Sequence, residues 1–177
     1  ETVLILSASS GVGTAAIQLA KNYIGATVIA TTSTADKADK ARGLGADEVI
    51  NYVEENVAEQ VKQKTDGRGV DVIIDHVGAD SWPDAFASLA PGGRYGICGV
   101  TSGYKAELQM GLMFLKHLTV FGVFMARTGD LRHIVELAGQ HVITGVIHQT
   151  FPLRDAAKAH ETMDGRNFFG KLILTMP

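Results

Sequence analysis

The 177-residue sequence predicts an α/β fold in which helices cover both faces of a doubly wound parallel sheet of about six strands. Short apolar runs alternate along the chain with stretches of helical periodicity. These runs are apolar throughout, as expected for parallel strands that are buried on both faces. Hydrophobic residues make up 46% of the sequence and charged residues 20%, which is typical of a packed domain.

The expected elements can be placed along most of the chain. Six runs are predicted as strands: Val3–Ser7, Thr27–Thr32, Glu48–Asn51, Val70–Asp75, Gly93–Val100 and Thr119–Phe124. Helices are predicted at Val12–Ile24, Ala35–Gly43, Glu54–Thr65, Ser81–Leu89 and Asp130–Ala138. Two β-α-β-α-β halves with right-handed crossovers give an expected strand order of 3-2-1-4-5-6.

The alternation changes after Ala138. The remaining sequence predicts a strand, a helix and a closing strand at Val146–Phe151, Leu153–Asp164 and Lys171–Thr175. A chain of 177 residues is long enough for one domain and hardly two. We therefore expect residues 1–177 to form a single domain, with residues 140–177 as a small appendage of it.

Composition and charge argue against several classes of protein. The formal net charge of −3 gives no basic excess for binding nucleic acid. The longest apolar stretch, Met110–Ala126, is interrupted by Lys116 and His117 and is too short for a membrane span. The single cysteine, Cys98, excludes an internal disulfide framework and fits the cytoplasm. Because Cys98 lies in an apolar run, we expect a buried and unreactive thiol.

The first predicted strand leads through a turn of small residues directly into a helix. The turn, Ser7-Ala8-Ser9-Ser10-Gly11-Val12-Gly13, is a degenerate form of the Gly-x-Gly-x-x-Gly pattern that holds a dinucleotide pyrophosphate. Small residues let the backbone approach the phosphates, and the helix N-terminus offers unpaired N–H groups. Ser9 and Ser10 can add hydroxyl donors. This succession of strand, small-residue turn and helix predicts a Rossmann-type nucleotide-binding domain.

The end of the second predicted strand indicates which dinucleotide is bound. NAD-binding domains carry an Asp or Glu there, about 20 residues beyond the turn, for the ribose 2′-hydroxyl. This chain instead has Thr32 and Ser33, no acid before Asp36, and then the cation of Lys37. Hydroxyls and a cation suit a 2′-phosphate, so NADP is expected. NAD stays as the alternative cofactor, with Lys37 then only a solvated helix residue.

No catalytic residue and no metal site are predicted within the sequence. Its six histidines are scattered without the close spacing of metal ligands. The sequence has no Tyr-x-x-x-Lys pair, no Gly-x-Ser-x-Gly and no Walker A motif. His76 lies at the carboxyl end of the fourth predicted strand, where we expect a structural role or a place at the cofactor's edge.

Six segments in register resemble one known family. They are ASSGVGTAAIQLAK, LGADEVINY, GRGVDVIIDHVG, LAPGGRYGICG, FPLRDAAKAH and FFGKLIL. Together they resemble the medium-chain dehydrogenase/reductase superfamily, and within it the branch of quinone oxidoreductases and zinc-type alcohol dehydrogenases. The resemblance extends over essentially the whole chain.

The resemblance implies cofactor contacts in each part of the chain. Pyrophosphate contacts are implied for the turn residues Ser9, Ser10, Gly11, Val12 and Gly13. Ser33, Lys37 and Tyr52 match positions that hold the 2′-phosphate in NADP-using relatives, with Thr32 beside them. Asp75, Val77 and Gly78 would lie near the adenine and its ribose. The nicotinamide side would be approached by Gly99, Val100, Val123 and Phe124, and Asn167 would also face the cofactor.

The resemblance also implies partners outside this sequence. Family members begin with a catalytic domain of GroES-like fold, which is absent from this chain and would hold any zinc. The isolated chain is therefore expected to fold without turning over a substrate. A homodimer is expected through the edge strand Thr119–Phe124, because an apolar sheet edge invites pairing with a second copy.

The expected function is that of the NADP(H)-binding part of an oxidoreductase, in which hydride passes to or from an alcohol, a quinone or an enone. One alternative is a dinucleotide-binding module without catalysis, with a redox-sensing or structural role. A methyltransferase is a third hypothesis, disfavoured because no acid ends the second strand.

Overall fold

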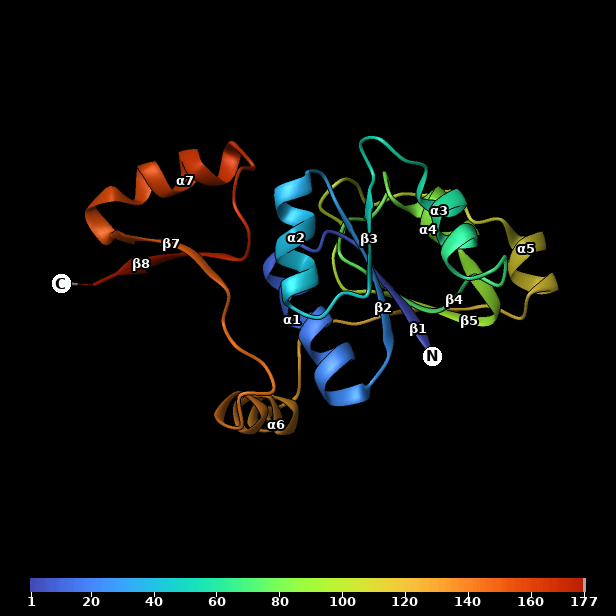
Figure 1. The fold of residues 1–177 in the computed structure, drawn as a ribbon, viewed down its shortest axis with the longest axis horizontal. Helices are drawn as coiled ribbons and strands as arrows, with labels where there is room; N and C mark the ends of the chain where they lie inside the picture. The colour runs from blue at the N-terminus through green and yellow to red at the C-terminus, as the bar shows by residue number, and fades with distance from the viewer. Residues whose placement is uncertain (177) are drawn as a thin grey trace.

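The computed structural model, which describes residues 1–176, contains one sheet of six parallel strands in the order β3-β2-β1-β4-β5-β6 (Figure 1). The predicted fold class and strand order are confirmed. The strands are β1 (Thr2–Ile5), β2 (Thr27–Thr32), β3 (Glu48–Asn51), β4 (Val70–Asp75), β5 (Leu89–Ile97) and β6 (Thr119–Gly122).

Helices bury both faces of this sheet. One face packs against α1 (Gly11–Gln18) and α2 (Ala35–Gly43), and the other against α3 (Val57–Lys64) and α4 (Trp82–Ala87). Alternate residues of each strand point to opposite faces. In β2, Val28 and Ala30 join the core under α1 and α2, whereas Ile29 joins the core under α3 and α4.

Several predicted boundaries differ from those of the structure. The helix expected at Val12–Ile24 is α-helical only in α1 and continues as a π-helical segment, Leu19–Ile24. The helix expected from Glu54 begins at Val57, because the side chain of Asn56 caps it by accepting from the Glu59 amide at 2.9 Å. Strand β5 starts at Leu89 rather than Gly93 and ends at Ile97.

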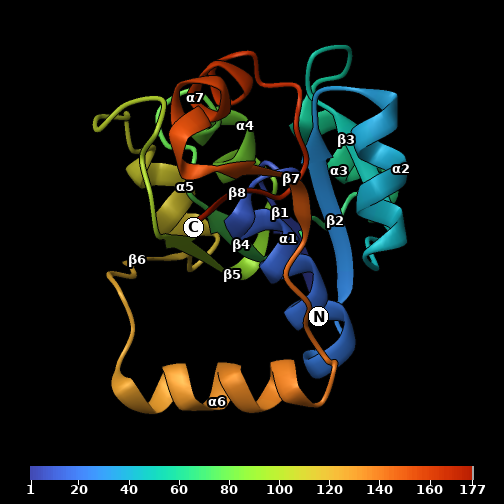
Figure 2. The ribbon, with the colours of Figure 1, turned by 90° about the vertical axis from the view of Figure 1, so that its left-hand side faces the viewer.

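The stretch that follows β5 contains a helix that the sequence did not predict. This helix, α5 (Met110–Leu115), has no fully buried residue. Strand β6 then forms the sheet edge, as expected, and α6 (Thr128–Gly139) crosses below the body of the molecule (Figure 2). Only Leu137 of α6 is buried. No helix among residues 1–176 is both long and apolar enough to cross a membrane.

The C-terminal appendage folds back onto the first β–α turn. Strands β7 (Ile147–Pro152) and β8 (Lys171–Thr175) pair in parallel, joined through a 3₁₀ turn (Leu153–Asp155) and α7 (Ala156–Asp164). Phe169 is buried in the core beneath α1 and α2. The Gly170 amide donates to the carbonyl oxygen of Ser9 at 2.8 Å. The appendage therefore contacts the turn that was predicted to hold phosphate.

Candidate functional site

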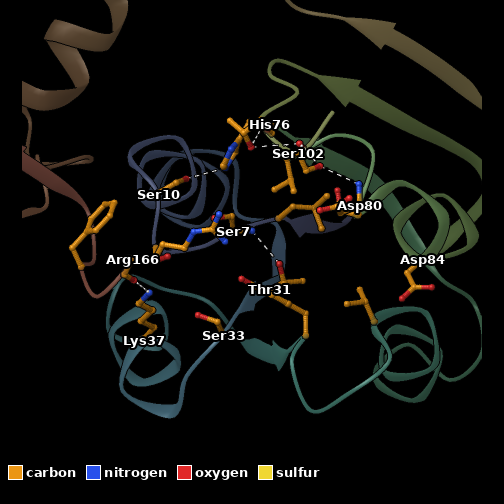
Figure 3. Close-up of a pocket in the computed structure, with 18 residues that line it drawn as sticks. Ser7, Ser10, Thr31, Ser33, Lys37, His76, Asp80, Asp84, Ser102 and Arg166 are labelled. Carbon is orange, nitrogen blue, oxygen red and sulfur yellow. Dashed lines mark hydrogen bonds between the residues drawn. The ribbon is translucent and has the colours of Figure 1, made fainter. Parts of the chain in front are cut away.

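A cavity of about 590 Å³ opens at the carboxyl ends of the parallel strands (Figure 3). This is the edge at which open α/β sheets bind ligands, and the volume lies within the range of small-molecule sites. Its walls come from the β1–α1 turn, the ends of β2 and β3, the loops after β4 and β5, and the segment before β8. The polar lining includes Ser7, Ser9, Ser10, Thr31, Ser33, Lys37, Tyr52, His76, Asp80, Ser81, Asp84, Thr101, Ser102 and Arg166.

The β1–α1 turn is held by its own backbone and by the neighbouring strand. Ser7 adopts a left-handed conformation with φ 55°, and the Ala8 amide donates to the Thr31 carbonyl at 2.8 Å. Ser10 is the N-cap of α1, and its hydroxyl accepts from the Gly13 amide at 2.8 Å. A side chain at Gly13 would collide with the backbone of Ser7. This small-residue turn thus brings backbone N–H groups to the cavity wall.

His76 contacts the same turn from the loop after β4. Its Nε2 atom lies 2.8 Å from the hydroxyl oxygen of Ser10. The side chain is only 9% exposed and lines the cavity. His76 and Ser10 therefore join the ends of β1 and β4, which are adjacent strands in the sheet.

Lys37 and Arg166 form a cationic end of the cavity (Figure 3). The Lys37 ammonium donates to the Arg166 carbonyl oxygen at 2.6 Å. Burial lowers the pKa of Lys37, with Asp36 opposing and Lys40 adding to that shift. Arg166 has φ 53°, and both residues line the cavity. Lys37 thus contacts the backbone of Arg166, whose own side chain extends into the cavity towards Ser7 (Figure 3).

Acidic side chains lie on the other side of the cavity. Figure 3 shows Asp80 and Asp84 away from Lys37 and Arg166. The Asp84 carboxylate accepts from the Asn56 amide group at 3.2 Å. The cavity therefore has opposite charges at its two ends, and an anionic group is favoured only at the cationic end.

Asp75 is fully buried beneath the loop after β4 and does not line the cavity. Its carboxylate accepts from the amides of Val77 at 2.6 Å and Gly78 at 3.1 Å, and from the Tyr95 hydroxyl at 2.9 Å. Burial, reinforced by the Asp75 charge, raises the pKa of Tyr95 far above its usual value. Asp75 thus fixes the loop that carries His76.

The structure brings together only some of the residues that were predicted to bind cofactor. Ser9, Ser10, Ser33, Lys37, Tyr52 and Val77 line the cavity. The other predicted residues are not part of its lining: Gly11, Val12, Gly13, Thr32, Asp75, Gly78, Gly99, Val100, Val123, Phe124 and Asn167.

These other residues have distinct surroundings. Thr32 is buried, and its hydroxyl has no hydrogen-bond partner among residues 1–176. Gly78 has φ 95°, and a side chain there would meet Gly103 and Val100 in the loop after β5. Phe124 follows β6 and is 94% exposed.

Sequence reasoning missed several polar groups of the site. Arg166 and Ser102 line the cavity beside Thr101, which the resemblance had placed towards the nicotinamide, and Lys171 packs its ammonium against Gly11 at the start of α1. Arg166 and Lys171 belong to the segment that includes Asn167, so the available signals were the Gly165-Arg166-Asn167 triplet and the Gly170-Lys171 pair. Their cations could not be assigned to the site before the C-terminal segment was seen to fold back.

A family model described as "Zinc-binding dehydrogenase" matches residues 11–140, which is more than half of the chain. The chain belongs to the zinc-binding dehydrogenase family. The family resemblance predicted from the sequence motifs is thereby confirmed.

This zinc-binding dehydrogenase domain has sequence relatives and solved structures that resemble it. It is 34% identical over 183 residues to a 2-haloacrylate reductase of Burkholderia sp, covering 97% of this chain and 54% of that reductase. A crystal structure of an NAD-dependent alcohol dehydrogenase matches at 37% identity and a TM-score of 0.93, covering 100% of this chain and 51% of that one. Escherichia coli quinone oxidoreductase complexed with NADPH matches at 33% identity and a TM-score of 0.84, covering 98% and 56% respectively. The chain spans about half the length of these relatives.

The family's description implies zinc, but the described part of this dehydrogenase domain does not fit a zinc site. Among residues 1–176, no group of three His, Cys, Asp or Glu side chains is placed to hold a metal ion. Cys98 is exposed just after β5, so the expectation of a buried thiol was wrong. Desolvation of its sulfur, followed by the nearby Asp75 charge, raises the pKa of Cys98, which disfavours the thiolate that zinc needs.

Proposed function

We propose that this chain is the NADP(H)-binding domain of an oxidoreductase that transfers hydride to or from an alcohol, a quinone or an enone. The observation that carries the proposal is the cationic end of the cavity, where Lys37 and Arg166 lie together with the lining residues Ser33 and Tyr52. Cations and hydroxyl groups are the donors that a phosphate monoester needs.

Different residues would bind the pyrophosphate and the 2′-phosphate of the cofactor. We assign the pyrophosphate to the N-terminus of α1, where the turn exposes backbone N–H groups and the ammonium of Lys171 packs against Gly11. We assign the 2′-phosphate to Lys37 and Arg166. The nearest acid in sequence, Asp36, forms an exposed ion pair with Lys40 at 2.7 Å.

Two solved relatives carry different cofactor names, so family membership alone does not choose between them. One is called an NAD-dependent alcohol dehydrogenase, and the other is a quinone oxidoreductase complexed with NADPH. The choice of NADP for this chain rests on its own residues. No carboxylate follows β2 where an NAD-binding domain grips the ribose, and two cations line that end of the cavity.

The nicotinamide would supply the hydride chemistry, and this chain would bind and orient it. Thr101 and Ser102 line the cavity after β5, which supports placing the nicotinamide end beyond them, towards Gly99, Val100, Val123 and Phe124. We assign no acid or base in this chain. Substrate contacts and any zinc would belong to residues outside it, in keeping with relatives about twice as long.

Titration with the two reduced cofactors tests the proposal. NADPH and NADH fluorescence would be followed on adding protein at fixed ionic strength, because phosphate contacts are screened by salt. We expect NADPH to bind about tenfold more tightly than NADH, the difference that one well-placed charge-assisted contact provides. Failure to bind either dinucleotide would overturn the proposed function, and equal affinities would overturn the choice of NADP.

A further inference from the structure

A hydrogen-bonded network holds the Asp84 carboxylate at the acidic end of the cavity. The side-chain amide of Asn56 donates from Nδ2 to Oδ2 of Asp84 at 3.2 Å, and its Oδ1 atom accepts from the backbone amide of Glu59 at 2.9 Å. Because the Glu59 amide needs an oxygen as its partner, the NH₂ group of Asn56 must point towards Asp84. The neighbouring Trp82 and Phe86 of α4 are buried, with their rings stacked 5.0 Å apart, so the helix that carries Asp84 is anchored in the core.

The network leaves part of the Asp84 carboxylate available to the cavity. Asp84 lines the cavity, and among residues 1–176 its side chain accepts a hydrogen bond only from Asn56. An ionised carboxylate offers about four acceptor positions on its two oxygens and has no hydrogen to donate. A ligand group that contacts Asp84 must therefore be a hydrogen-bond donor.

The part of a dinucleotide that reaches this end follows from the shape of the adenosine ribose. This ribose carries the pyrophosphate at its 5′ position, the 2′-hydroxyl or 2′-phosphate, and the base at its 1′ position. The proposed function places the first at the β1–α1 turn and the second beside Lys37. The base then occupies the remaining part of the cavity, on the side of Asp84, which lies away from Lys37 (Figure 3).

The walls of this remaining part suit a planar base. Val57 at the start of α3, Val77 after β4 and Tyr52 after β3 line the cavity and offer apolar and aromatic surface. Val57 directly follows Asn56, the residue that donates to Asp84, so the apolar wall and the carboxylate are adjacent. Apolar walls with one or two well-placed polar groups are the usual means by which a pocket orients its ligand.

We propose that Asp84 accepts a hydrogen bond from the 6-amino group of adenine and makes the site selective for adenine over purines with a carbonyl at that position. The inference rests on the proposed function, because it needs a dinucleotide in the cavity. Hypoxanthine is the matched purine, since it carries an oxygen where adenine carries the amino group. The lone pairs of that oxygen would face the Asp84 carboxylate. The N1–H of hypoxanthine lies at the next ring position, so the ring would have to shift to use it.

The test compares NADH with the reduced nicotinamide hypoxanthine dinucleotide. The two ligands differ only at position 6 of the purine, and both are followed by the fluorescence of the dihydronicotinamide. We expect the wild type to bind NADH about tenfold more tightly than the hypoxanthine analogue, as the loss of one charge-assisted hydrogen bond provides. A fully buried donor-reading site discriminates far more, but Asp84 is only half-buried.

Asp84→Asn gives the decisive variant because Asn56 fixes how the new amide is turned. The NH₂ group of Asn56 still needs an acceptor, so it takes the oxygen of the new side chain, and the new NH₂ group is left facing the cavity. A donor then stands where the carboxylate stood. The preference for NADH should disappear or reverse in favour of the hypoxanthine analogue.

Asp80→Asn is the matched control, since Asp80 also lines the cavity at its acidic end but is exposed. It should keep the preference of the wild type, and thermal melts establish that each variant folds. Equal wild-type affinities for the two ligands overturn the inference, as does a preference that persists in Asp84→Asn or is lost in Asp80→Asn. If neither NADH nor NADPH binds to the wild type, the proposed function itself has failed.

Discussion

The Lys37 ammonium lies 2.6 Å from the Arg166 carbonyl oxygen, although 129 positions separate the two residues in the sequence. This contact ties α2 to the segment that leads into β8. An ammonium group has three N–H donors, and the Arg166 carbonyl uses one of them. Lys37 is therefore held in place by the Arg166 backbone, with donors left for a ligand.

Replacing Lys37 by alanine should weaken NADPH binding by about tenfold, equivalent to roughly 1.4 kcal/mol. Charge-assisted contacts to phosphate contribute about 1.5–3 kcal/mol when well placed, and salt screening reduces this. NADH binding should hardly change, because NADH has no 2′-phosphate. The measurement is the Kd of each cofactor for wild type and Lys37→Ala at one ionic strength.

Lys40→Ala is the matched control on the same helix. Lys40 pairs with Asp36 on the surface and does not line the cavity, so its loss should leave both affinities unchanged. If Lys37→Ala weakens NADH as much as NADPH, then Lys37 does not select for the 2′-phosphate.

The sheet and half of the site could be predicted because they depend on local sequence. Apolar β-branched runs specify buried strands, and the end of each run places residues such as Ser10 and Lys37 at the same edge of the sheet. Arg166 could not be assigned in this way. It reaches the site only because Phe169 and Gly170 anchor the C-terminal segment to the core and to the β1–α1 turn.

Asp75 illustrates a second limit. The family resemblance implies a place for Asp75 near the cofactor, but the direction of its side chain depends on the loop that follows β4. Here the amides of Val77 and Gly78 and the hydroxyl of Tyr95 draw the carboxylate into the protein. Likewise, α5 was missed because its sequence is an apolar run without a polar face to give a helical period.

Removing the Tyr95 hydroxyl should destabilise the fold. Tyr95→Phe leaves one oxygen of the fully buried Asp75 carboxylate without its donor, which typically costs about 1–3 kcal/mol. The free energy of unfolding in urea would show the loss. Tyr104→Phe is the control, since Tyr104 is 90% exposed and should change stability by less than about 0.5 kcal/mol. Equal stability of the two variants would mean that the Tyr95–Asp75 bond contributes nothing.

Two glycines in helices should respond to alanine in opposite directions. Helix propensity alone favours alanine at both by up to about 1 kcal/mol. At Gly13, however, the new Cβ would meet the Ser7 carbonyl oxygen and lie 2.9 Å from the Ala8 Cα, and such backbone crowding costs about 1–3 kcal/mol. At Gly43 it would meet nothing within 4 Å. Thermal melts should therefore show Gly13→Ala destabilised and Gly43→Ala unchanged or stabilised, and a stabilised Gly13→Ala would refute the close packing of the turn.

Asp47 should make the fold sensitive to acid. Burial acts to raise the pKa of its carboxyl, but hydrogen bonds from Lys21 at 2.5 Å and from the Val28 amide at 2.8 Å hold that pKa below the ordinary 3.8. The pKa of Asp47 is lower in the folded protein than in the unfolded chain. Its ionised carboxylate therefore stabilises the fold fully above about pH 4, and this stabilisation is lost as pH falls through the folded-state pKa.

Asp47→Asn should thus cost about 0.5–1 kcal/mol near neutral pH, a modest value because a third of the side chain is exposed. Near pH 3 the difference from wild type should shrink, as measured by urea unfolding at both pH values. Asp39→Asn is the control, since Asp39 is 79% exposed and should matter little at either pH. A difference that grows on acidification would contradict this account.

The free edge of β6 should pair two copies of the chain. β6 is the terminal strand of the sheet, and apolar side chains stand exposed near it, including Phe121 at 43% and Val123 at 47%. The Val123 amide donates to Ile97 of β5 at 2.8 Å. Because amides alternate in direction along a strand, the amide of Val120 points towards the open edge.

A dimer formed by pairing of β6 with its copy should therefore depend on the amide of Val120. Val120→Pro removes that N–H, whereas proline at an edge strand leaves the ladder to β5 intact. Val120→Ala keeps the N–H and serves as the control. Sedimentation at micromolar concentration should give dimers for wild type and Val120→Ala, and monomers for Val120→Pro. A monomeric wild type would rule out a dimer through this edge, and a dimeric Val120→Pro would show that the copies meet through another surface.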